Sequence, residues 1–164
     1  MNKNIELLNE VIDDIDKIED SEWVSTLNSR KIKELEFHDR DRTHQQSDNQ
    51  VDEKTEGDTF EKFYSNKKYY KIVNRSNSFV QNWIKKESKN NIFLDYACGN
   101  GVNARVAAAS GASLSLGFDI SGVSIENSIK FAREEKLENI RFFQADAENT
   151  KLPDNSIDRI ICSG

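Results

Sequence analysis

The second half of the sequence predicts an α/β fold with a parallel sheet, and the first half predicts helices that precede it. From residue 91 onward, short apolar runs alternate with helical segments in the order strand, helix, strand, helix, strand, loop, strand. Connections of these lengths suit right-handed crossovers between parallel strands. A chain of 164 residues is long enough to bury such a core.

The composition and charge of the chain argue against several classes of protein, including those that bind nucleic acid and those that span a membrane. The charged fraction is 32% and the net charge is -6, so nucleic acid is not an expected partner. We expect no membrane span, because apolar runs are short and the N-terminus is acidic, and we expect a cytoplasmic location. Cys98 and Cys162 lack metal-ligand neighbours, which predicts small buried thiols and no metal site. We interpret His38 and His44 as surface residues.

Residues 1–41 are expected to form N-terminal helices. Apolar residues recur at three- and four-residue steps across residues 4–19, which is typical of an amphipathic helix. Ser21 and Ser29 are candidate N-caps of two further helices, the second of which should end near Arg40.

Two segments separate these helices from the predicted sheet. Residues 42–58 contain a single apolar side chain, Val51, and are expected to form a flexible linker. Residues 59–90 regain helical periodicity. We expect them to form a lid or cap region of two or three helices, broken near residues 74–77.

An acid and a glycine-rich turn follow the first expected strand, in the segment Asp95-Tyr-Ala-Cys-Gly-Asn-Gly101. Glycines let the backbone approach a ligand closely, and the following helix N-terminus suits an anionic group. An acid before the glycines favours positive charge on the ligand. An amino-acid zwitterion near a sulfonium satisfies both features. The alternative interpretation of Asp95 is a cap for the following helix.

A second acid, Asp119, ends the next expected strand. Ligands of open parallel sheets lie beyond the carboxyl ends of the strands, where an acid can bind ribose hydroxyls. This pair of features is not specific, because Gly99-Asn-Gly-Val-Asn-Ala104 also satisfies a dinucleotide fingerprint. An ordinary solvated strand end is also open for Asp119.

A third acid distinguishes a cationic adenosine ligand from an anionic dinucleotide. Asp146 ends the third expected strand, where its carboxylate could accept from an exocyclic adenine amine, and the Ala147 N–H could donate to a ring nitrogen. Three acids at three successive strand ends fit a cationic adenosine ligand better than an anionic dinucleotide.

The segments LDYACGNG, GFDIS and FFQADAENTKLPDNSIDRIICSG resemble the first three motifs and the fourth strand of class I S-adenosylmethionine-dependent methyltransferases. The resemblance covers about residues 91–164 and implies a Rossmann-like sheet with S-adenosylmethionine as cofactor. At the methionine end it implies that Asp95 orders the amino group, directly or through water, above a loop of Ala97, Gly99 and Gly101. The family usually has glycine at the position of Ala97.

At the adenosine end, the resemblance implies that Asp119 holds both ribose hydroxyls and that Ile120 packs on the adenine. Asp146 and Ala147 would read the adenine edge. The implied function is methyl transfer to an unidentified acceptor, for which we expect a small molecule. No catalytic base is predicted. The alternatives are a non-catalytic module that binds the cofactor or a partner, and an NAD-dependent oxidoreductase.

Members of this family continue beyond the fourth strand. The sequence ends at Gly164, so we expect a partial fold that lacks activity on its own. Its fourth strand, IDRIIC, would then lie at an exposed edge, where apolar strands can pair with another copy of the chain.

Overall fold

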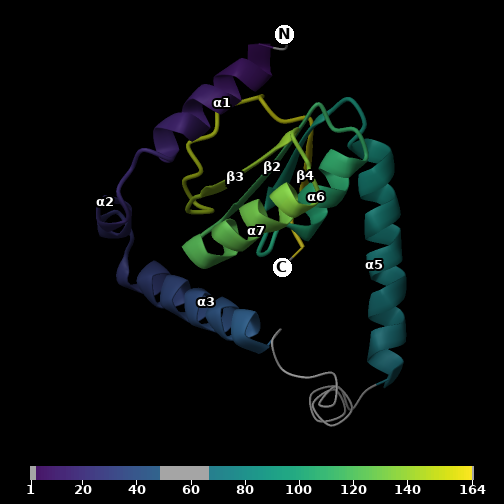
Figure 1. Ribbon diagram of the computed structural model, residues 1–164, viewed down its shortest axis with the longest axis horizontal. Helices are drawn as coiled ribbons and strands as arrows, with labels where there is room; N and C mark the ends of the chain where they lie inside the picture. Colours follow the sequence, from purple (N-terminus) through teal and green to yellow (C-terminus); the bar gives the residue numbers. More distant parts are fainter. Residues whose placement is uncertain (1–2, 49–66, 164) are drawn as a thin grey trace.

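The computed structural model describes residues 3–48 and 67–163, and Figure 1 shows how the elements are arranged. The helices are α1 (Lys3–Ile15), α2 (Asp20–Ser25), α3 (Ser29–Asp48), α5 (Lys67–Glu87), α6 (Val102–Ala109) and α7 (Gly122–Glu134). The strands are β1 (Ile92–Tyr96), β2 (Leu114–Asp119), β3 (Ile140–Gln144) and β4 (Arg159–Ile161). The alternation of strands and helices predicted for the second half is confirmed.

The four strands form one parallel sheet in the order β3-β2-β1-β4. The register places Asp95 of β1 between Gly117 of β2 and Ile161 of β4, and it pairs Asp119 with Gln144 of β3. The carboxyl ends of β1, β2 and β3 therefore meet at one edge of the sheet. The parallel α/β fold predicted from the sequence, with helices before it, is confirmed.

Helices cover both faces of the sheet (Figure 1). On one face, Leu8 and Ile12 of α1 are fully buried against a cluster of strand residues that includes Leu94, Leu116 and Phe118. On the other face, α5, α6 and α7 bury Phe93 and Phe142, the side chains that alternate with those of the first face: Ile84, Ala107 and Ala112 surround Phe93, and Ala104, Ile125 and Ala132 surround Phe142. Burial on both faces explains the nearly continuous apolar runs of β1 and β2.

The helix boundaries in the first half differ from those predicted. Helix α1 ends at Ile15, and Ser21 lies inside α2 rather than at its cap. The Asn28 side chain, not Ser29, caps α3, because its Oδ1 accepts from the amides of Arg30 and Lys31, both at 3.1 Å. The side-chain oxygen of Asn28 thus satisfies N–H groups that have no partner inside the helix.

The two segments between α3 and β1 also differ from prediction. Helix α3 continues past Arg40 to Asp48, so the expected linker 42–58 begins inside a helix. The rest of that linker, 49–58, lies outside the described residues. Helix α5 runs without a break through residues 74–77, where we expected one.

Strand β4 forms one edge of the four-stranded sheet, as predicted. Its Ile160 side chain is 55% exposed. The prediction of two buried thiols is wrong for Cys162, which is exposed because it follows this edge strand, whereas Cys98 is partly buried. No helix in the described parts of the chain is long and apolar enough to cross a bilayer.

Candidate functional site

A cavity of about 640 Å³ opens at the carboxyl ends of β1, β2 and β3. Its floor comes from the turn after β1 and from the residues that end β2 and β3, and its roof comes from α3. Six of the eight predicted cofactor-binding residues line it, namely Ala97, Gly99, Asp119, Ile120, Asp146 and Ala147. The two others, Asp95 and Gly101, do not.

The turn after β1 is held in an unusual backbone shape. Ala97, Gly99 and Gly101 have φ angles of 56°, 52° and 67°, in the left-handed region that disfavours residues with a Cβ. The hydroxyl of Ser128, on α7, donates to the Gly99 carbonyl at 3.1 Å and so ties the turn to that helix. The Asn100 side-chain oxygen, also in this turn, is buried without a hydrogen-bond partner among the described residues.

Ala97 carries a conformational penalty that glycine would not. We expect Ala97→Gly to raise the free energy of unfolding by about 0.5–1 kcal/mol, because the left-handed region costs alanine more than the extra freedom of glycine costs the folded state. Urea denaturation measures the change. The matched control is Ala109→Gly, at an exposed site in α6, which should destabilise by about 1 kcal/mol. A destabilised Ala97→Gly would contradict the argument.

The Asp95 carboxylate lies beneath the start of α6 rather than on the cavity wall. Its side chain is buried, and Oδ2 accepts from the Ala104 amide at 3.2 Å. Burial raises the pKa of Asp95 to about 7, although hydrogen bonds from Ala104 and Asn103 act to lower it. The Asp95 carboxylate therefore accepts a hydrogen bond from the N-terminus of α6, the contact that the alternative interpretation of this residue predicts.

Asp119 organises the backbone around the cavity. Its Oδ2 accepts from the Gly99 amide at 2.8 Å and its Oδ1 accepts from the Ser121 amide at 3.0 Å. A carboxylate has about four acceptor positions, so these two bonds leave capacity for a ligand. The same side chain thus fixes the glycine turn and lies on the cavity wall.

Asp146 and Ala147 belong to a turn that other side chains hold in place. Asp146 Oδ1 accepts from the Glu148 amide at 2.9 Å, and Oδ2 accepts from Lys31 Nζ at 2.5 Å. Burial favours a higher pKa for Asp146, but the bonds from Lys31 and the Glu148 amide lower it overall. The Tyr96 hydroxyl donates to the Ala147 carbonyl.

Sequence reasoning missed the roof of the cavity. Four residues of α3 line it: Arg30, Lys31, Glu34 and His38. His38, predicted to be a surface residue, is half-buried and lines the cavity. The side chain of His44 lies outside the described residues. No local pattern in the α3 sequence indicates which far residues it will contact.

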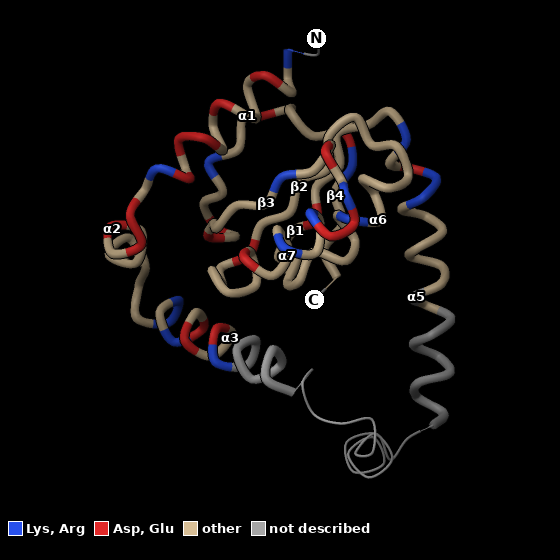
Figure 2. The backbone as a smooth tube through the Cα atoms, viewed as in Figure 1, with Lys and Arg blue, Asp and Glu red and all other residues tan. Residues whose placement is uncertain are grey.

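Charged groups are distributed unevenly around the site. Figure 2 shows acidic residues along α1 and α2, and both signs of charge on the described part of α3. Among the described residues, no group of three or more His, Cys, Asp or Glu side chains could hold a metal ion.

Comparison with known proteins gives one family match. A family model described as a methyltransferase domain matches residues 93–164, the part of the chain that contains the glycine turn and all four strands. No curated protein matches the chain.

Solved structures similar to the chain include the YcgJ protein from Bacillus subtilis, at 30% identity over 51% of this chain and a TM-score of 0.47. The PRMT1 enzyme-prozyme complex with AdoHcy from Trypanosoma brucei is 27% identical over 56% of this chain, with a TM-score of 0.47. An rRNA methylase from Streptococcus thermophilus is 16% identical over 52% of this chain, with a TM-score of 0.47. The chain spans 36%, 29% and 48% of the lengths of these three structures, respectively.

Proposed function

Because the methyltransferase-domain family model matches residues 93–164, we propose that the cavity at the carboxyl ends of β1, β2 and β3 binds S-adenosylmethionine. The observation that carries the proposal is the convergence of the glycine turn, Asp119 and Asp146 on one cavity. These three features come from three different strand ends. The resemblance of the sequence motifs, taken together, implies the same ligand for all three.

The polar groups of the cavity fit the parts of this cofactor. Four acids line the cavity, Glu34, Asp119, Asp146 and Glu148, and they suit a ligand that carries a sulfonium and an ammonium group. The unpartnered Asn100 oxygen would accept a hydrogen bond from the ammonium, and buried oxygens of this kind need such a donor. The Asp95 carboxylate lies beneath the start of α6 rather than on the cavity wall. It would therefore act on the ammonium through a water molecule or through the backbone of the turn after β1.

The adenosine end fits in the same way. Asp119 retains acceptor positions for the ribose hydroxyls beyond its two backbone bonds. Ile120 would pack on the adenine, and Asp146 with the Ala147 amide would read its edge. The Tyr96 hydroxyl donates to the Ala147 carbonyl and so ties the turn after β3 to the end of β1.

The cofactor supplies an electrophilic methyl group, and the protein orients and desolvates it. The reaction we propose is transfer of that methyl to an acceptor. A small-molecule acceptor and a cytoplasmic location are inferences from the sequence. His38 and Glu34 of α3 line the cavity, so an acceptor entering beneath α3 would meet both side chains.

Calorimetry with S-adenosylhomocysteine and, separately, NAD tests the proposed ligand. We expect micromolar-range binding of S-adenosylhomocysteine and much weaker binding of NAD. Four acids that line the cavity would repel a pyrophosphate, and the cations that line it, Arg30 and Lys31, are already paired with three of those acids. Preference for NAD would overturn the proposal in favour of a dinucleotide enzyme. Binding of the methyl donor without turnover of any acceptor in a broad panel would favour a non-catalytic module.

The same assay on Asp119→Ala tests the residue with the most direct proposed role. We expect at least about a tenfold loss of affinity for S-adenosylhomocysteine. The variant lacks the carboxylate that is proposed to accept two charge-assisted hydrogen bonds from the ribose hydroxyls, each worth about 1.5–3 kcal/mol. The matched control is Asp154→Ala, an exposed acid in the loop before β4, which should bind as the unmodified protein does. Thermal melting of both variants separates loss of binding from loss of fold. An unchanged affinity would exclude Asp119 from the site.

A further inference from the structure

Side-chain contacts at two points hold helix α3 over the cavity; we call these two contacts its fastenings. At one point, Lys31 contacts Asp146 and Glu148 in the turn after β3. At the other, the Ser121 hydroxyl, which also caps α7, donates to Asp39 Oδ1 at 2.6 Å. The stretch of α3 between these points carries Glu34 and His38, which line the cavity.

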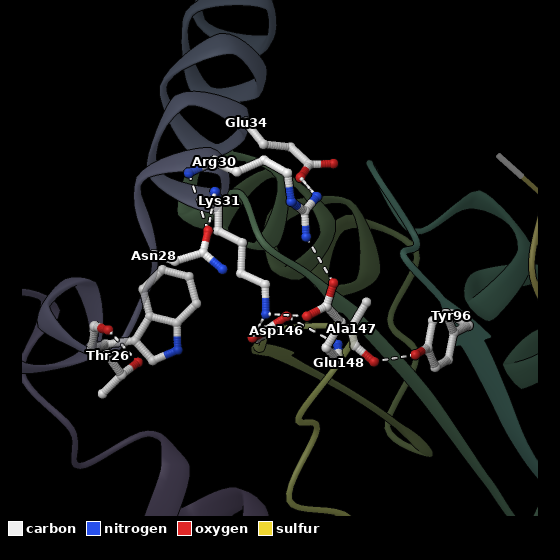
Figure 3. A network of polar contacts seen from close by, with 10 residues as sticks. Thr26, Asn28, Arg30, Lys31, Glu34, Tyr96, Asp146, Ala147 and Glu148 are labelled. Carbon is white, nitrogen blue, oxygen red and sulfur yellow. Dashed lines mark hydrogen bonds and ion pairs between the residues drawn. The ribbon is translucent and has the colours of Figure 1, made fainter.

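Lys31 is the most buried charged residue of this roof. It is 8% exposed, and its Nζ lies 2.5 Å from Asp146 Oδ2 and 2.7 Å from Glu148 Oε2. Figure 3 shows its side chain pointing down from α3 to the turn that holds both acids. A buried ammonium is tolerated only when it is paired, so α3 can take this position only with the turn in place beneath it.

Arg30 has a different position, although it is the neighbouring residue. It is more exposed, and it bridges Glu148 Oε1 at 2.7 Å and Glu34 at 3.3 Å. Among the described residues of α3, Lys31 hydrogen-bonds directly to Asp146, whereas Arg30 acts on Asp146 through its charge. The hydrogen bonds that Lys31 donates to Asp146 and Glu148 raise the pKa of Lys31, which keeps its ammonium charged.

We propose that Lys31 is a positioning residue that holds the Asp146 carboxylate in the orientation in which it reads the adenine, and so couples the docking of α3 to cofactor binding. This inference rests on the proposed function. Without the Lys31 ammonium, which both carboxylates contact, the negative charges of Asp146 and Glu148 would repel each other in the turn after β3. Asp146 would then turn toward solvent, and α3 would lose one of its two fastenings.

A double-mutant cycle on binding of S-adenosylhomocysteine tests the coupling. We expect Lys31→Met to weaken binding about five- to tenfold, the usual size for directly interacting residues. In an Asp146→Ala background, Lys31→Met should have little further effect on binding, because the carboxylate that Lys31 positions is already absent. Lys31→Arg should restore most of the affinity. The matched control is Lys33→Met, at an exposed site on the same helix, which should leave binding unchanged.

The outcomes separate this inference from the proposed function. If the unmodified protein does not bind S-adenosylhomocysteine, the proposed function fails. If it binds and Lys31→Met binds equally well, only the role of Lys31 is overturned. Equal losses in the two backgrounds would also overturn it, because Lys31 would then act independently of Asp146. If Lys31→Met does not fold, as judged by thermal melting, Lys31→Gln replaces it in the cycle.

Discussion

In the protein without ligand, we expect the contribution of the Asp95 carboxyl to the free energy of unfolding to fall by as much as about 4 kcal/mol as the pH rises from about 4 to about 7. Burial raises the pKa of Asp95 from 3.8 to about 7. Between these values the unfolded chain has released the proton while the folded protein still holds it. Each unit of pH therefore favours the unfolded state by about 1.4 kcal/mol.

Urea denaturation across this pH range measures the effect, and Asp95→Asn identifies its source. The asparagine Oδ1 can still accept from the Ala104 amide, but it does not titrate, so this part of the pH dependence should disappear. Asp154→Asn, at an exposed position, should retain it. A pH profile that is identical in the unmodified protein and in Asp95→Asn would show that Asp95 titrates normally.

Replacement of Gly101 by alanine should destabilise the protein by about 2–5 kcal/mol. The φ angle of +67° costs a residue with a Cβ about 1–2 kcal/mol. In addition, the Cβ would lie 2.5 Å from Phe142 Cε1 and 2.9 Å from Ser128 Oγ. Phe142 is 5% exposed and packs among Ala104, Ile125 and Ala132, so relief of the clash requires repacking, at about 1–3 kcal/mol.

Gly122→Ala provides the matched control. The first atoms that its Cβ would meet are those of the Gln144 side-chain amide, at 3.5 Å, and Gly122 begins α7, where alanine is a good helix former. Its stability should therefore equal or exceed that of the unmodified protein. Equal stabilities of Gly101→Ala and Gly122→Ala would contradict the packing described around Phe142. Because Gly101 does not line the cavity, the expected effect of Gly101→Ala is a loss of folding stability rather than the loss of a ligand contact.

The fold of the second half could be predicted because its signals are local. The apolar runs at residues 92–97, 113–120 and 140–145 are long enough to identify buried strands, and the glycine turn marks where the first of them ends. The positions of Asp119 and Asp146 followed from the same logic, since acids at the ends of adjacent parallel strands must share an edge. The functional meaning of that edge came from the motifs together, not from any one acid.

The orientation of Asp95 could not be predicted from its position. A residue at a strand end can face the cavity or the helix that follows, and the choice depends on which amides the turn leaves unpaired. Here Ala104 offers such an amide. The length of α3 was also hidden, because residues 42–48 lack the apolar period on which the sequence prediction of a helix relied.

The roof of the cavity was hidden for a different reason. The contact of Lys31 with Asp146 joins residues 115 apart in the sequence, and nothing near Lys31 in the chain reflects its partner. Such contacts depend on the completed sheet, whose β3 end supplies the acid.

That separation also sets an order of assembly. During synthesis α3 leaves the ribosome early, but both of its fastenings, at Ser121 and at the 146–148 turn, are made much later. Closing loops of this size carries an entropy cost that local contacts do not. The helix that covers the cavity is thus among the first parts of the chain to be made and among the last to reach its final place. Until then, the glycine turn and the acids beneath it face open water.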